Sequence, residues 1–300
     1  LYFVFQIILT FISALYGEQF LENKIYEVLL VNQYIIILIP SLLYVFIKKL
    51  NFREVFRLKK LDILPAVLIV FMAIPAYFAA SMLNTLVLYV LQFIGNIPSQ
   101  SIPVPGNLVE LLIGILVVAV SPAICEEMLH RGVLLSAYER RGSIKSVVIT
   151  AIFFGFFHFD ITNLLGPIFL GLLIGYYVIK TDSIFAGVLA HFLNNFIAEV
   201  LSFIWGGEST ATRTVTITSE ELVGSIVFGC ICLIFVVSLL KLFRYVTRDK
   251  VKLKQPISSI RKDIISIVSH WPIIVISFLY VLMLGVYLLL IVSLKNSGIA

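Results

Sequence analysis

Three short sequences place acid, base and amide side chains inside hydrophobic stretches of this chain. They are Glu126-Glu127-x-x-x-Arg131, Phe154-x-x-x-His158 and His191-x-x-x-Asn195. Ionisable side chains cost free energy in a membrane unless they face a protein interior or a wet cavity. Carboxylates, imidazoles and amides are also the groups that activate water and stabilise an oxyanion. The three sequences therefore predict an active site inside the lipid bilayer.

The acidic pair predicts two different roles. Glu126 and Glu127 are adjacent, so on a helix their side chains point about 100° apart. Glu127 precedes Arg131 by four residues, the order and spacing that favour an ion pair on one helix face. Glu126 would then face the cavity, where its carboxylate could take a proton from water and deliver it to a leaving amine. A purely structural ion-pair network is the alternative interpretation.

The second and third sequences supply imidazole and amide groups that could act together with the glutamates. His158 and His191 are two of only four histidines in the chain. A single membrane histidine usually packs helices by hydrogen bonding, but two near a paired glutamate favour catalysis. Asn195 follows His191 by one helical turn, so its amide could stabilise an oxyanion. Asn194, three residues after His191, is a weaker candidate for the same role. His130 and His270 are interpreted as interfacial or packing residues, and Glu199 as an unexplained polar residue that could extend the cavity.

Composition indicates which elements must hold these residues. The chain has 300 residues, of which 60% are hydrophobic and 13% charged, and its mean hydropathy is +1.07. These values are typical of a polytopic membrane protein rather than a soluble domain. The net charge of +5 is expected to lie in loops that orient the spans, and the chain lacks the basic run with interleaved aromatics that nucleic-acid binding requires.

The hydropathy pattern predicts an all-α transmembrane bundle of about eight to nine spans with a polar cavity. Its first apolar stretch looks like a clipped span, so we expect the true N-terminus to be missing. The predicted spans are 1–16, 26–47, 63–95, 107–138, 144–158, 162–179, 183–205, 221–243 and 271–293.

Basic residues give the orientation and the depth of the site. They cluster at 48–60, 140–145 and 241–262, and the positive-inside rule makes these connections cytoplasmic. At about 1.5 Å per residue, Glu126 lies about 18 Å from Tyr138, His158 about 20 Å from Lys145, and His191 about 12 Å from Asp182. All three are therefore expected at comparable depth, in a site that opens toward the cytoplasm.

Other segments predict how the bundle is organised. Residues 51–62 mix apolar and basic side chains, which suits either a short helix on an anionic membrane surface or a solvated loop. Gly171-x-x-x-Gly175 is a motif for close helix packing. The three cysteines are expected to be small buried hydrophobes. We expect N-terminal helices with the interfacial segment at 1–106, a catalytic core at 107–205 and C-terminal helices at 206–300.

Together and in this order, the three sequences resemble the CPBP intramembrane protease family, which includes type 2 CAAX prenyl endopeptidases and bacterial Abi proteins. The resemblance covers about residues 107–205. Residues 121–132, Ser-Pro-Ala-Ile-Cys-Glu-Glu-Met-Leu-His-Arg-Gly, look like the family's small-Pro-x-x-x-Glu-Glu-x-x-x-Arg-Gly signature. His130 departs from it, because the family more often has an aromatic residue there.

The resemblance implies endoproteolysis by activated water. Glu126 matches the catalytic glutamate, which activates water together with His158, while Glu127 and Arg131 match the supporting pair. His191 and Asn195 match the residues that steady the oxyanion. An older view makes Glu126, His158 and His191 zinc ligands. We favour catalysis without a metal, since the soluble zinc-protease spacing His-Glu-x-x-His is absent.

The resemblance also implies a partner and a location. The expected substrate is a peptide or membrane protein, and the expected location is the bacterial cytoplasmic membrane, with the lipid bilayer as surroundings. A non-catalytic membrane scaffold or bacteriocin-immunity protein that keeps the fold is the main alternative. A proton-coupled transporter is less favoured, because the chain shows no pair of inverted halves with matched interrupted helices. The sequence does not indicate the cleavage site or the oligomeric state.

Overall fold

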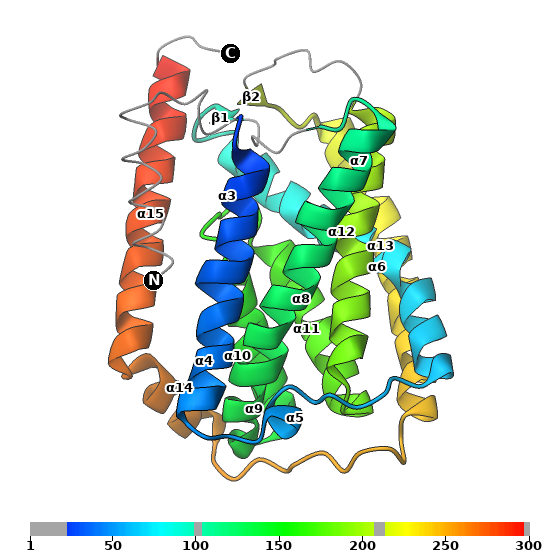
Figure 1. Ribbon diagram of the computed structural model, residues 1–300. Helices are drawn as coiled ribbons and strands as arrows, with labels where there is room; N and C mark the ends of the chain where they lie inside the picture. The colour runs from blue at the N-terminus through cyan, green and yellow to red at the C-terminus, as the bar shows by residue number, and fades with distance from the viewer. Residues whose placement is uncertain (1–22, 99–103, 207–213, 297–300) are drawn as a thin grey trace.

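The computed structural model describes residues 23–98, 104–206 and 214–296, which form a bundle of helices (Figure 1). The first half contains α3 (Ile25–Val31), the π-helical segment η1 (Asn32–Leu38), α4 (Ile39–Ile47), α5 (Phe52–Val55), α6 (Ile63–Leu91) and β1 (Ile97–Pro98). The predicted span 1–16 lies outside the described residues.

The middle of the chain is one long helix with π-helical interruptions. It comprises α7 (Leu108–Gly114), η2 (Ile115–Val120), α8 (Ser121–Glu127), η3 (Met128–Leu134), α9 (Leu135–Tyr138) and the 3-10 turn η4 (Glu139–Arg141). The elements after it are α10 (Ser143–Phe156), α11 (Leu165–Thr181), α12 (Ile184–Trp205), β2 (Thr214–Val215), α13 (Ser219–Val246), α14 (Ile260–Val268) and α15 (Trp271–Asn296). β1 and β2 pair antiparallel at one end of the bundle.

Among the described residues, six helices are long and apolar enough to cross a membrane, which confirms the predicted polytopic all-α bundle. They span residues 25–47, 63–91, 108–141, 184–205, 219–246 and 271–296. The predicted spans 144–158 and 162–179 are instead the shorter helices α10 and α11, of 14 and 17 residues. At about 1.5 Å per residue these two helices are shorter than the roughly 30 Å hydrocarbon layer.

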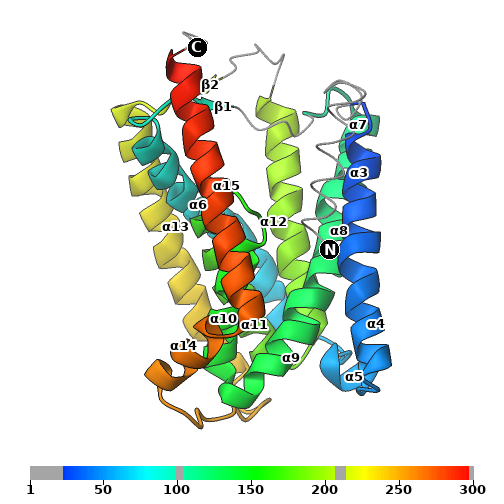
Figure 2. The ribbon, with the colours of Figure 1, turned by 90° about the vertical axis from the view of Figure 1, so that its left-hand side faces the viewer.

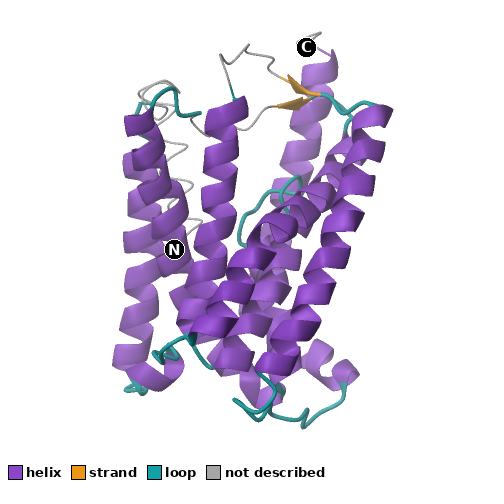
Figure 3. Cartoon of the chain, turned by 90° about the vertical axis from the view of Figure 1, so that its right-hand side faces the viewer, coloured by secondary structure: helices purple, strands orange, loops and turns teal. Residues whose placement is uncertain are grey.

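α10 and α11 form a hairpin that turns back inside the bundle. The loop that joins them lies at mid-height between the longer helices (Figure 3), and their outer ends lie at the same end as α5 and α14. The glycine motif lies at their contact: a Cβ atom at Gly171 would be 2.9 Å from the Cα of Ala151, and one at Gly175 would be 3.0 Å from Val147. This confirms the predicted close packing. Non-helical backbone at such depth is tolerated only where protein or a wet cavity surrounds it.

The largest buried cluster joins α6 and α11 to their neighbours α12 and α13. Its buried members are Leu68, Ile69, Met72, Ala76, Leu173, Tyr177, Ala186, Val236 and Phe243. α15 stands at the edge of the bundle in Figure 1, in front of the other helices in Figure 2, and it buries only Tyr280 and Ile291. The Tyr280 ring packs on Phe156, with 4.8 Å between centroids, at the turn that ends α10. α15 therefore covers the side of the hairpin loop.

Two sequence predictions need correction. Residues 51–62 are neither a surface helix throughout nor a solvated loop, the two interpretations that the sequence left open. They form the four-residue α5, after which the chain folds inward and buries Phe56 and Arg57. The cysteines are free, and Cys125 and Cys232 are buried as predicted, but Cys230 is exposed on the outer face of α13. An exposed thiol on an apolar span faces lipid, so burial inside the protein is not needed there.

Candidate active site

The centre of the site is a buried ion pair on the long middle helix. Nη1 of Arg131 donates to Oε1 of Glu127 at 2.7 Å, and both side chains are 0% exposed. This confirms the ion pair that the spacing of four residues predicts. The guanidinium also donates to the carbonyl of Gly171 at 3.3 Å and lies 4.6 Å from the centre of the Phe154 ring. Arg131 therefore links the long helix to both arms of the hairpin.

His191 brings α12 to the same carboxylate. Its Nδ1 lies 3.0 Å from Oε1 of Glu127. A carboxylate that pairs with Arg131 only accepts hydrogen bonds, so Nδ1 carries the hydrogen and Nε2 is left for another partner. Gly187, one turn earlier on α12, makes this approach possible, because a Cβ atom there would lie 2.5 Å from Oε2 of Glu127. The sequence did not predict the contact between His191 and Glu127.

The Phe154 ring is the point at which three helices of the site meet. His130, His158 and His191 each present a ring edge-on to it, with centroid distances of 5.0, 5.3 and 5.5 Å. These histidines come from η3, the turn after α10, and α12. The structure thus brings His158 and His191 to one level beside Arg131, as the count of residues from the basic end predicted.

The other two histidines of this cluster also use Nδ1 to hold their rings in place. Nδ1 of His158 donates to the carbonyl of Phe154 at 2.8 Å, and Nδ1 of His130 donates to the carbonyl of Glu126 at 3.0 Å. A carbonyl can only accept, so each Nδ1 carries a hydrogen and each Nε2 has a free lone pair in the neutral ring. Nε2 of His130 is buried and has no partner among the described residues.

Glu126 faces a partner that the sequence analysis missed. Nε2 of Gln33, on η1, donates to its Oε1 at 2.8 Å, and Glu126 remains 9% exposed. Gln33 is a buried amide in an apolar span, which is itself a signal of a polar interior. Gln33 lies on the π-helical segment η1, and Glu126 lies on α8, between the π-helical segments η2 and η3. π-Helical segments are rare in proteins overall, but those that occur are often found at functional sites.

Asn195 joins the neighbouring part of the long helix rather than the Phe154 cluster. Its Nδ2 donates to the carbonyl of Val118 at 3.0 Å, and its Oδ1 accepts from Asn194. One N–H of the Asn195 amide stays available, since a primary amide has two. Glu199, one turn beyond, is buried against Gly114, and its Oε1 has no partner among the described residues.

The fit of a metal can be judged from the donors. Nε2 lone pairs of His158 and His191 and the carboxylate of Glu126 are groups that zinc accepts. Among the described residues, however, no three His, Cys, Asp or Glu side chains lie close enough together to hold a metal ion. The described residues therefore do not assemble the zinc set of Glu126, His158 and His191 that the older view requires, and we derive no step through a metal.

One of three comparisons with known proteins gave a match. A family model described as type II CAAX prenyl endopeptidase Rce1-like matches residues 108–197. The searches of curated proteins and of solved structures gave no match. The matched segment carries the long middle helix, the α10–α11 hairpin and α12 as far as Ile197, and so contains every predicted catalytic residue. Residues 108–197 are therefore similar to the type II CAAX prenyl endopeptidases, and this match supports the resemblance to the CPBP family that the three sequence motifs indicate.

Proposed function

We propose that the protein is an intramembrane endopeptidase that cleaves a peptide or a membrane-associated protein with water activated by Glu126 and His158. The similarity of residues 108–197 to a family of CAAX-type proteases supports peptide-bond hydrolysis in a membrane. The observation that carries the proposal is the cluster around Phe154. A carboxylate, a guanidinium and imidazoles from separate helices meet there inside an apolar bundle, an expensive arrangement that membrane proteins keep for function.

The proposed reaction needs one proton transfer in each direction. Glu126 takes a proton from water as the water oxygen bonds to the scissile carbonyl carbon. Nε2 of His158 accepts a hydrogen bond from the second O–H of this water. The carbon–nitrogen bond then breaks, and Glu126 returns the proton to the leaving amine nitrogen. Gln33 holds the carboxylate of Glu126 in place through its donor to Oε1.

The proposed oxyanion stabilisers are His191 and Asn195. Because Nδ1 of His191 faces Glu127, only Nε2 can donate to an oxyanion, and this requires the doubly protonated ring. Asn195 supplies the second N–H of its amide, since the first donates to the carbonyl of Val118.

The proposed location is the bacterial cytoplasmic membrane, and the lipid bilayer surrounds the bundle. The end that carries α5, α14 and the helix-connecting basic residues faces the cytoplasm by the positive-inside rule. The site would open toward that side. We propose a reaction that needs no metal, with metal analysis of active protein as its check: activity that depends on stoichiometric zinc would contradict it.

The test replaces one carboxylate by its amide. Glu126→Gln should lower peptide cleavage about 100-fold or more, because general acid–base catalysis contributes at least that factor. Glu220→Gln, the same change at an exposed position, is the control and should cleave like the unaltered protein. Comparing the proteins of cells that carry each form should reveal the substrate as an uncut precursor. Equal cleavage by both variants would remove Glu126 from the mechanism.

One observation favours the alternative of a non-catalytic scaffold or immunity protein. Glu127 is shared by Arg131 and His191, and Glu126 is held by Gln33, so the polar groups also satisfy one another. A cellular phenotype that survives both Glu126→Gln and His158→Ala would support this alternative.

A further inference from the structure

A cavity of about 780 Å³ lies at the end of the bundle where α5 and α9 meet. Its lining comes from the last turn of α4, the segment 50–59, α9 with η4, and the single residues Val133, Asp182 and Lys254. The volume is in the range of small-molecule sites, about 300–1,000 Å³. The cavity is lined by none of the predicted catalytic residues, so it is separate from the candidate active site.

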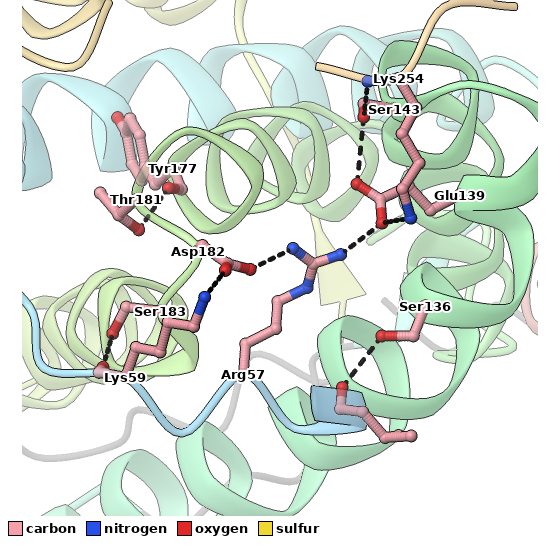
Figure 4. Close-up of polar contacts among 11 residues, drawn as sticks. Arg57, Lys59, Ser136, Glu139, Ser143, Tyr177, Thr181, Asp182, Ser183 and Lys254 are labelled. Carbon is pink, nitrogen blue, oxygen red and sulfur yellow. Dashed lines mark hydrogen bonds and ion pairs between the residues drawn. The ribbon is translucent and has the colours of Figure 1, made fainter. Parts of the chain in front are cut away.

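Part of the cavity lining is basic, and ion pairs hold several of its side chains in place. Arg57 donates from Nη1 to Asp182 at 2.7 Å and from Nη2 to Glu139 at 2.9 Å (Figure 4). Its side chain is 7% exposed, and its Nε has no hydrogen-bond partner among the described residues. Lys59 and Lys254 pair with the same two carboxylates. The acids of this wall are therefore already neutralised.

Two further cations lining the cavity have no acidic partner among the residues that the structure describes. Arg53 and Arg140 are both exposed, and they make no ion pair there. Five basic side chains line the cavity against three acidic ones, which leaves an excess positive charge of two. Arginine guanidinium groups are well suited to bind phosphate oxygens in pairs. The basic wall thus has the chemistry of an anion site.

The cavity also has apolar lining residues close to the lipid-facing surface. Tyr44 on α4 and Leu50 just after it line the cavity, and Phe46 and Ile47, between them in the sequence, are 79% and 70% exposed. This end of the bundle lies at the membrane surface, where the spans stop. A free phosphate ion has no apolar part to contact these apolar side chains. A phospholipid would place its headgroup on the arginines and its acyl chains along α4.

We propose that this cavity binds the headgroup of an anionic phospholipid, with Arg53 and Arg140 contacting the phosphate and Arg57 forming the fixed wall. The segment that would carry the lipid also contacts the catalytic helix. Ser136 donates to the carbonyl of Val55 at 2.9 Å, and Phe56 packs against Gly132, the neighbour of Arg131. Lipid binding therefore stabilises the contact between segment 50–59 and the helix that carries Glu127.

The experiment measures binding of short-chain phosphatidylglycerol to the purified full chain in a neutral detergent. Dioctanoyl phosphatidylglycerol should bind saturably, and dioctanoyl phosphatidylcholine about tenfold or more weakly, because the zwitterionic headgroup has no net charge to pair. Inorganic phosphate and glycerol phosphate form a separate arm that tests a soluble anion. Either of them binding as tightly as the lipid would overturn the lipid assignment.

Two variants test the site without touching the predicted catalytic residues. Arg53→Gln with Arg140→Gln should weaken phosphatidylglycerol binding about tenfold or more, while Lys60→Gln with Lys252→Gln removes two exposed charges outside the lining as the matched control. Ala137→Trp fills the cavity without changing charge and should abolish saturable binding. Thermal unfolding establishes that each variant is folded. Unchanged lipid binding in both test variants, or an equal loss in the control, overturns the proposal.

Discussion

Nδ1 of His191 lies 3.0 Å from Oε1 of Glu127, although the two residues are 64 positions apart in the chain. The contact joins α12 to the long middle helix at the depth of the Phe154 ring. Since Arg131 shares the same oxygen, one carboxylate fixes the position of a cation on its own helix and an imidazole on another. The geometry of the site depends on Glu127 as much as on the proposed catalytic Glu126.

Glu127→Gln should therefore be strongly destabilising as well as inactivating. It leaves the Arg131 guanidinium buried without a counter-charge, a loss that costs about 3–5 kcal/mol. Unfolding in denaturant, measured on protein in detergent, gives the size of this change. Glu220→Gln at the surface should stay within about 0.5 kcal/mol of the unaltered protein.

A double variant separates the loss of stability from the loss of activity. Glu127→Leu with Arg131→Met removes both charges, and replacing a buried pair by apolar side chains is often neutral or stabilising. The double variant should recover most of the lost stability and remain inactive, because His191 has lost its acceptor. A double variant as unstable as Glu127→Gln would show that the ion pair itself supplies the stability.

The sequence predicted the parts of the site that depend on one helix or on counting along it. The Glu127–Arg131 pair follows from a spacing of four, and the common depth of His158 and His191 follows from the distance to the basic end. The contact of His191 with Glu127 depends on how two helices are rotated about their axes, which one sequence does not specify. Gln33 was missed for the same reason, because its donor role needs η1 packed beside α8.

The fold, like the site, has some features that the sequence predicted and others that depend on contacts between distant residues. Hydropathy identified the long spans, but it also made α10 and α11 look like crossings, since a buried hairpin and a span are equally apolar. Their lengths were the available signal. The inward fold of segment 51–62 could not be predicted from its mixture of basic and apolar residues. That fold depends on Glu139 and Asp182, which lie far away in the sequence and pair with Arg57.

Arg57 should prove to be a positioning residue for the site. It ties η4, which continues the helix of Glu127, to Asp182, which precedes the helix of His191. Arg57→Gln leaves two partly buried carboxylates without this partner, and we expect a loss of about 2–3 kcal/mol. Arg57→Lys should be intermediate, because an ammonium lacks the planar fork that reaches both acids. Denaturant unfolding measures both effects.

Two controls sharpen the test at Arg57. Lys59→Gln removes a cation that is 67% exposed and pairs with the same Asp182, so its cost should stay below about 1 kcal/mol. Arg57 also has a φ of 46°, a left-handed conformation that glycine adopts about 1–2 kcal/mol more easily than other residues. Arg57→Gly should therefore be more stable than Arg57→Ala. The reverse order would contradict the left-handed backbone at this position.

Gly171 should tolerate no side chain. A Cβ atom there would lie 2.9 Å from the Cα of Ala151, and that backbone atom cannot move without shifting α10. We expect Gly171→Ala to cost about 1–3 kcal/mol, the usual cost of overpacking, and to disturb the bond from Arg131 to the carbonyl of Gly171. Gly285→Ala is the control, because nothing lies within 4 Å of a Cβ atom there. Equal unfolding of both variants would contradict the close contact.

Asp263 should make the attachment of α14 and α15 sensitive to acid. Lys145 donates to its Oδ2 at 2.5 Å, and Ser258 and Arg141 each donate to its Oδ1 at 2.6 Å. These donors hold the pKa of the Asp263 carboxyl well below its ordinary value of 3.8. A lowered pKa in the folded state gives stability that is complete above the ordinary value and is lost as pH falls through the folded-state value.

Asp263→Asn removes this contribution at neutral pH and so provides the comparison. Hydrogen exchange of α14 and α15 should be faster in the variant than in the unaltered protein by a constant factor between about pH 5 and 8, since the carboxylate is ionised throughout that range. As pH falls below about 4 the difference should begin to shrink, and it should vanish only as pH falls through the lowered folded-state pKa of Asp263. A difference that already shrinks near neutrality, or variant exchange equal to that of the unaltered protein at pH 7, would show that α14 is held by other contacts.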